Sequence, residues 1–146
     1  MMHRTKSILL VALQFLFIFI LLKGFRPGNL SFPALGFISL SLGLVFWAII
    51  TMRKSKLRIL PDPASGATLI TNGPYRFIRH PIYTAILLGA VGLLISHFSI
   101  TRLIISILLL ADLIIKLLFE EKMLMKTFEA YKSYMASTSR LIPLFF

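Results

Sequence analysis

The sequence predicts an all-α integral membrane protein with four transmembrane helices, the third and fourth as a hairpin, and a C-terminal amphipathic helix. Hydrophobic residues make up 58% of the 146 positions and the mean hydropathy is +0.89, which is too apolar for a soluble domain. Of the 16 Lys and Arg residues, 13 lie before the first apolar run, between the second and third, or from residue 116 onward. By the positive-inside rule, both termini and these polar segments then face the cytosol.

The four apolar runs have the lengths expected of membrane-spanning helices in a single domain over residues 1–146. No small-residue cleavage site follows the first run, which therefore predicts a retained helix rather than a signal peptide. The second run is long enough to cross a hydrocarbon layer of about 30 Å. Pro81 marks the start of the third, because its fixed φ suits the first helical position. The predicted spans are residues 8–22, 30–52, 82–98 and 103–119.

Small residues at four-residue spacing occur inside the second and third spans. Ser39 and Gly43 form one such pair, and Ala85 and Gly89 form another. Pairs of this kind let neighbouring helices approach closely. They predict tight packing between spans, and they leave open a homodimer through the same faces.

Two polar segments border the spans. Residues 53–80 form the longest connection, and a connection of this length in a compact protein is usually functional. Gly73-Pro74 predicts a turn within it. After the fourth span, apolar and aromatic residues recur at three- and four-residue steps between Leu124 and Tyr134. That pattern predicts an amphipathic helix over about 120–136, lying against the membrane or over a site.

The fourth span carries ionisable residues on one face, because Asp112, Lys116 and Glu120 follow each other at four-residue steps. Charged residues within a span are costly and normally face the protein interior or a wet cavity. One interpretation is a salt-bridge ladder with a structural role. The other is a polar pocket reached from the cytosol and lined by Lys116 and Glu120. Glu121 points about 100° away and is expected to hold the loop or to cap the next helix.

Several function classes are disfavoured by the composition. The chain has no cysteine, which excludes thiolate catalysis and Cys-ligated metals, and its three separated histidines give no metal-site signature. The net charge of +11 is expected to contact anionic membrane lipids rather than nucleic acid, because no nucleic-acid motif accompanies it. Gly-rich nucleotide motifs are also missing.

Two segments resemble the signature of the isoprenylcysteine carboxyl methyltransferase family, a signature shared with membrane phospholipid methyltransferases. The first is Thr68-Leu-Ile-Thr-x-Gly-Pro-Tyr-x-x-x-Arg-His-Pro-x-Tyr83. The second is Glu120-Glu121-x-x-Leu124-x-x-x-Phe128-x-x-Tyr131-x-x-Tyr134, followed by Arg140-Leu-Ile-Pro143. The resemblance covers residues 66–143 and implies methyl transfer from S-adenosyl-L-methionine.

The resemblance also implies roles for particular residues. The methyl donor would lie in a pocket formed by the 66–83 segment, the end of the fourth span and the C-terminal helix, with a lipid or other lipophilic small molecule as the acceptor. Lys116 and Arg140 would lie near that acceptor and carry the catalytic role. Lys116 stands where family members commonly have Arg. Lysine lacks the planar guanidinium group that binds a carboxylate through two hydrogen bonds. The acceptor group is therefore left open among a carboxyl, an amine, a thiol and a phenol. The implied cofactor-binding residues are Ala67, Thr68, Leu69, Ile70, Tyr75, His80, Pro81, Ile82, Tyr83 and Glu120.

Two other functions are compatible with the sequence. Membrane sterol reductases resemble the C-terminal region and use NADPH, although no additional basic cluster for a 2′-phosphate is evident here. A small membrane scaffold would use its charges only to set its topology. Donor binding that depends on His80 and Glu120 would distinguish the methyltransferase from both.

Overall fold

The computed structural model describes residues 2–23, 25, 28, 30–53 and 68–143, and this part of the chain is helical. Its one β-type pairing is an isolated parallel bridge between Ile78 and Ser139. The predicted all-α class is therefore confirmed. The helices are α1 (Met2–Leu22), α2 (Phe32–Met52), the short 3₁₀ helix η2 (Gly73–Arg76), α3 (Pro81–Ser96), α4 (Ile100–Thr127) and α5 (Tyr131–Ser137).

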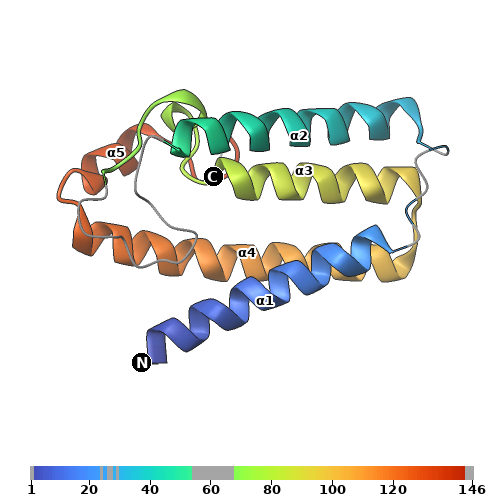
Figure 1. Ribbon diagram of the computed structural model, residues 1–146, viewed down its shortest axis with the longest axis horizontal. Coiled ribbons are helices and arrows are strands. Elements are labelled where there is room, and N and C mark those ends of the chain that lie inside the picture. The colour runs from blue at the N-terminus through green and yellow to red at the C-terminus, as the bar shows by residue number, and fades with distance from the viewer. Residues whose placement is uncertain (1, 24, 26–27, 29, 54–67, 144–146) are drawn as a thin grey trace.

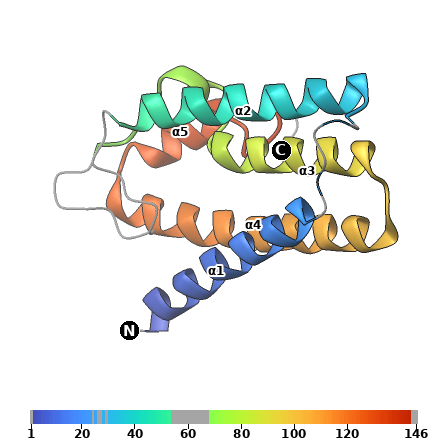
Figure 2. The same ribbon diagram turned by 45° about the vertical axis from the view of Figure 1, so that its right-hand side comes forward.

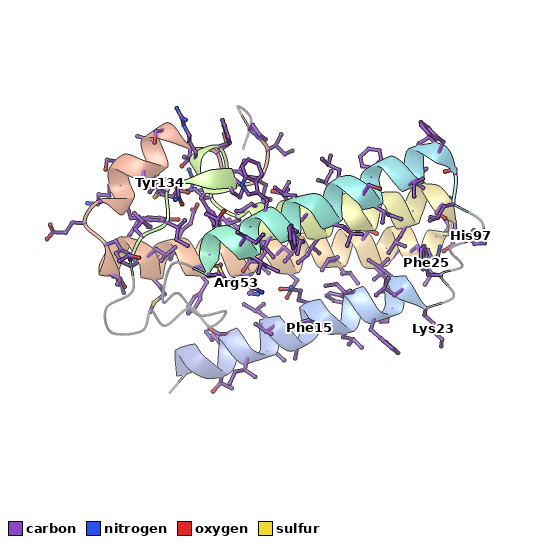
Figure 3. All side chains as sticks on the ribbon, turned by 45° about the horizontal axis from the view of Figure 1, so that its top comes forward. Phe15, Lys23, Phe25, Arg53, His97 and Tyr134 are labelled. Atoms are coloured by element: carbon purple, nitrogen blue, oxygen red, sulfur yellow. The ribbon has the colours of Figure 1, made fainter. Side chains whose placement is uncertain are left out.

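The four long helices run alternately up and down one axis in two pairs (Figures 1 and 2). α2 packs most extensively against α3, and α1 against α4, whereas the consecutive helices α3 and α4 touch less. The end of α2, the start of α3, the end of α4 and all of α5 lie at one end of the molecule (Figure 1). Figure 3 places Arg53 and Tyr134 at this end and Lys23 and His97 at the other. The polar segments of the sequence therefore share one end of the bundle.

The interface between α1 and α4 follows a seven-residue repeat. Ser7, Gln14 and Leu21 are the buried residues of α1 for which side chains are described. Gln14 bonds to Lys116 of α4, and Leu21 packs in one core cluster with the fully buried Leu109 and Leu113 of that helix. A seven-residue repeat keeps one seam of a helix against its neighbour. Two of the three residues in this repeat, Ser7 and Gln14, are polar.

The interface between α2 and α3 depends on small residues. The Ser41 hydroxyl donates a hydrogen bond of 2.7 Å to the carbonyl of Ala85. A Cβ placed on Gly89 would lie 3.1 Å from the Ser41 hydroxyl, so Gly89 allows this approach. The predicted pair of Ala85 and Gly89 is thus confirmed as a contact surface. The pair of Ser39 and Gly43 does not form a contact surface. Ser39 is exposed and nothing approaches Gly43, so both residues face away from α3.

Two helices are long and apolar enough to cross a membrane: α1 over Thr5–Leu22 and α2 over Phe32–Met52. α3 is apolar but has 16 residues, and α4 has 28 residues but carries the charged residues noted above. Large apolar side chains lie on the outside, such as Phe15 at 62% exposure and Phe46 at 68%. So many exposed large apolar side chains are unusual for a soluble protein and are expected for helices that contact lipid.

The C-terminal part differs from the predicted helix over 120–136. α4 continues through Glu120 to Thr127, Phe128 is extended, and the separate helix α5 covers only Tyr131–Ser137. The break turns α5 back over the loop that precedes α3, where the Tyr134 hydroxyl donates a 2.6 Å hydrogen bond to the Tyr75 carbonyl. Burial of the two tyrosines of α5 against this loop therefore ends the continuous helix.

Gly73 gives a first testable prediction. Its φ is +59°, and a Cβ there would lie 2.6 Å from the Thr51 hydroxyl at the end of α2. We expect Gly73→Ala to lower the free energy of unfolding by at least about 1 kcal/mol, because it combines a left-handed backbone with a steric clash. Thermal denaturation in detergent measures this effect. Gly43→Ala is the control, since it adds a methyl group in open space on α2 and should be neutral or slightly stabilising.

Candidate active site

Glu120 of α4 and the first turn of α3 form a polar cluster. The Tyr83 hydroxyl donates a short hydrogen bond of 2.6 Å to Glu120 Oε1. His80 Nδ1 lies 3.7 Å from Glu120 Oε2, and the His80 ring stacks on the Tyr83 ring with centroids 5.2 Å apart. Pro81 occupies the first turn of α3, as predicted, and places His80 at the N-cap. The two polar segments singled out in the sequence thus meet at one cluster.

Glu121 is more deeply buried than Glu120 and belongs to a second cluster. Arg79 Nε lies 2.7 Å from Glu121 Oε1, and Arg140 Nε lies 3.0 Å from Oε2. Burial alone would raise the pKa of Glu121, but the neighbouring His80 ring and the hydrogen bonds from Arg79 and Arg140 lower it to about 2. His80 Nε2 lies 3.7 Å from Oε1, too far for a hydrogen bond, so the two guanidinium groups supply the main stabilisation of the carboxylate. Glu121 therefore holds the loop, one of its two expected roles.

The backbone of residues 139–141 fixes the segment that carries His80. Arg79 N–H donates to the Ser139 carbonyl at 2.8 Å, and His80 N–H donates to the Arg140 carbonyl at 3.0 Å. The Thr84 hydroxyl donates to the Leu141 carbonyl at 2.7 Å. The Arg79 guanidinium also donates to the Thr138 carbonyl. These bonds, together with Glu121, determine where the His80 ring lies.

Tyr75 borders the cluster from the η2 turn. Its carbonyl accepts the hydrogen bond from Tyr134, and its hydroxyl lies 3.5 Å from the Met52 sulfur at the end of α2. Burial, with a smaller contribution from the negative charge of Glu120, raises the pKa of Tyr75 to about 12. The phenol therefore stays protonated at physiological pH and acts as a wall and a hydrogen-bond donor, not as a base.

Lys116 lies one helical turn deeper than Glu120. Its ammonium donates a 2.8 Å hydrogen bond to Gln14 Oε1 and lies 5.0 Å from the centre of the Tyr83 ring. Both carboxylate oxygens of Asp112 are buried without a hydrogen-bond partner, and neither Asp112 nor Glu120 forms an ion pair with Lys116. The salt-bridge ladder considered from the sequence is therefore not formed. Instead, Lys116 connects α1 to the cluster through Tyr83.

An apolar cavity of about 290 Å³ opens between the two helix pairs. It begins about one helical turn from Tyr83, at Ile86 of α3, and its polar lining comes chiefly from Ser41. The other lining residues are Ile18, Leu21, Leu22, Phe25, Ile38, Leu42, Gly89, Ala90, Leu93 and Leu109. This lining suits a hydrocarbon chain and not a polar ligand.

The structure brings together some of the residues implied by the resemblance and separates others. His80, Tyr83 and Glu120 are in contact, and Lys116 joins them through the Tyr83 ring. Arg140 instead lies on the Glu121 side. The other implied residues lie in the same loop or first helical turn: Thr68 is exposed, Leu69 and Ile82 are partly buried, and Ile70 and Pro81 are buried. Ala67 lies outside the described residues.

Two side chains that contact the site residues were not predicted from the sequence. Arg79 was given no role of its own beyond the basic charge expected to contact membrane lipids, yet its side chain is only 7% exposed and pairs with Glu121. Gln14 was not predicted to belong to the site, although it is a lone amide in a long apolar run. Polar residues within spans are usually retained for a function, and that signal would have identified Gln14.

The fold and the cluster define a class: a helical protein with membrane-type helices that holds a carboxylate, an imidazole and a phenol at one end of its bundle. The family model for phospholipid methyltransferases matches residues 31–131, and the chain therefore belongs to the phospholipid methyltransferase family. The suspected kinship with membrane methyltransferases is thereby confirmed. No curated protein and no solved structure matches the chain. The family match includes His80, Tyr83 and Glu120 but not α1.

Proposed function

We propose that this protein transfers a methyl group from S-adenosyl-L-methionine to a lipophilic acceptor that reaches the site from the bilayer. The observation that carries the proposal is the contact of Glu120 with both His80 and Tyr83 in a chain of the phospholipid methyltransferase family. The carboxylate and the imidazole come from segments 40 residues apart, and a single small molecule can touch both.

The side chains of the cluster fit the polar parts of this donor. Glu120 keeps 18% of its side chain exposed and can accept from an ammonium group or ribose hydroxyls. His80 Nδ1 lies 3.7 Å from Glu120 Oε2, beyond hydrogen-bond range, which leaves this nitrogen available to a polar group of the donor. The bound donor supplies an activated methyl group on a sulfonium. The protein holds the reactants in line and excludes water, which suffices for an acceptor that is already nucleophilic.

The apolar cavity supports a lipophilic acceptor. Its lining would take a hydrocarbon chain, while the polar end of the acceptor would lie near Tyr83 and Lys116. Lys116 and Arg140 are the residues proposed to act near the acceptor. The bond between Arg140 and Glu121 makes Lys116 the more direct candidate.

We further propose that all four long helices cross the membrane, with α3 and α4 as a hairpin and both termini in the cytosol. α3 and α4 support this with apolar side chains on their outer surfaces, including Ile95 at 43% exposure and Ile115 at 57%. The site would then open at the cytoplasmic face, where the donor is found, and the basic residues of that end would contact membrane lipids.

Isothermal titration of the detergent-purified protein with S-adenosyl-L-methionine tests the proposal. We expect saturable binding by the wild type and a rise in melting temperature with the donor, both lost in the double variant His80→Ala/Glu120→Ala. Binding of NADPH in place of the methyl donor would instead favour a reductase. Absence of binding by the wild type would contradict the proposed function.

The cavity gives a second prediction. Ala90 lines it and is buried, so Ala90→Leu should fill part of the space. We expect about a tenfold loss of methyl transfer to a lipid extract, unchanged donor affinity and an unchanged or higher melting temperature. Labelled-methyl incorporation measures the transfer. Full activity of Ala90→Leu would show that the acceptor does not use this cavity.

A further inference from the structure

Helix α1 lies outside the segment matched by the family, yet one of its side chains reaches the site. Gln14 Oε1 accepts a hydrogen bond of 2.8 Å from the Lys116 ammonium. Gln14 is 7% exposed and Lys116 is 5% exposed, so water does not replace this contact. Hydrogen bonds to a charged group contribute more than neutral ones, and their loss from a buried site is correspondingly costly.

This bond limits where the flexible Lys116 side chain can place its charge. The ammonium lies between the Gln14 oxygen and the Tyr83 ring, whose centre is 5.0 Å away. Tyr83 in turn donates to Glu120. A continuous line of contacts thus runs from Gln14 through Lys116 and Tyr83 to the cluster proposed to hold the donor.

Helix packing alone does not explain an amide at this position. The next seam position of α1 is Leu21, and leucine at position 14 would enter the bilayer more readily than glutamine. The carboxylate oxygens of Asp112, one turn from Lys116, have no hydrogen-bond partner. Among the described residues, Gln14 therefore supplies the oxygen bonded to this ammonium.

We propose that Gln14 is a positioning residue that holds Lys116 at the acceptor end of the site, so that α1 supplies a polar contact there in addition to apolar lining of the cavity. The inference rests on the proposed methyl transfer. It assigns to α1 a role in acceptor recognition and none in donor binding, because Gln14 touches Lys116 and neither His80 nor Glu120.

The test compares Gln14→Leu, Gln14→Glu and Ser7→Ala in the full-length protein in detergent. The probes are methyl-labelled S-adenosyl-L-methionine and a total lipid extract of the expression host. For Gln14→Leu we expect the half-saturating lipid concentration to rise roughly tenfold or more, with the donor dissociation constant unchanged within about twofold. Gln14→Glu keeps an oxygen at the same reach and should stay within about threefold of wild type. Ser7→Ala removes another buried polar group from the same seam and should change neither value.

The outcomes separate the two proposals. If the wild type binds the donor and Gln14→Leu keeps the wild-type half-saturation, the role of Gln14 is overturned while the proposed function stands. The role of Gln14 is also overturned, with the proposed function still standing, if Gln14→Leu and Ser7→Ala raise the half-saturating lipid concentration equally. Both substitutions would then act only through the packing of α1. If the wild type neither binds the donor nor methylates lipid, the proposed function fails and the role of Gln14 fails with it.

Discussion

Glu120→Gln is expected to weaken the binding of S-adenosyl-L-methionine about 100-fold or more. The carboxylate is the anionic group of the cluster that remains partly exposed, and truncating one side of a desolvated charge pair typically costs 2–5 kcal/mol, with tenfold in affinity for each 1.4 kcal/mol. The amide oxygen of glutamine can still accept from the Tyr83 hydroxyl, so the fold should be retained. Isothermal titration measures the affinity, and the melting temperature without donor verifies the fold.

Glu129→Gln is the matched control for this experiment. It removes the same charge from an exposed position between α4 and α5, and it should leave donor affinity unchanged. A dissociation constant for Glu120→Gln within about threefold of wild type, in a protein that binds the donor, would exclude Glu120 from the donor site.

The second large effect is expected at Glu121, and it depends on pH. The folded pKa is about 2 against an ordinary value of 4.5, so the ionised side chain stabilises the folded state. The stabilisation that comes from a depressed pKa is complete at pH values above the pKa of the unfolded state. It is lost as the pH falls from about 4.5 toward 2. At 1.36 kcal/mol per pH unit, Glu121→Gln should cost about 3 kcal/mol at neutral pH.

This cost should shrink by about 2 kcal/mol at pH 3, because the unfolded wild type is then largely protonated at Glu121 while the folded protein is not. Chemical denaturation in detergent at the two pH values measures the difference between variant and wild type. Glu129→Gln serves again as the exposed control and should show little effect at either pH. If Glu121→Gln loses the same amount of stability at both pH values, the shape of the Glu121 side chain, and not its charge, accounts for the loss.

Much of the helical framework was predictable from the sequence, because long apolar runs and proline have direct consequences for the backbone. Pro81 begins α3 as expected, and Gly73-Pro74 forms the η2 turn. The end of α4 was not predictable in the same way. No Gly or Pro interrupts residues 120–136, and the break at Phe128 follows from tertiary burial of the α5 tyrosines.

The sequence anticipated a contact between its two recognisable polar segments, and it did not indicate a contact made by an isolated polar residue. The meeting of His80 with Glu120 could be anticipated because both belong to recognisable polar segments. The pairing of Gln14 with Lys116 joins residues 102 positions apart. The hydrophobic pattern of α1 does not indicate which face packs against α4, because lipid-facing residues are as apolar as those at the helix interface.

The backbone pairing of residues 77–80 with 139–140 has a consequence for biosynthesis. While the ribosome has made only the four long helices, the His80 loop lacks its partner segment, even if every helix is already in the bilayer. On the proposed function, the donor site is completed only after residue 139 has been made, and we expect a nascent chain stalled before that residue not to bind S-adenosyl-L-methionine.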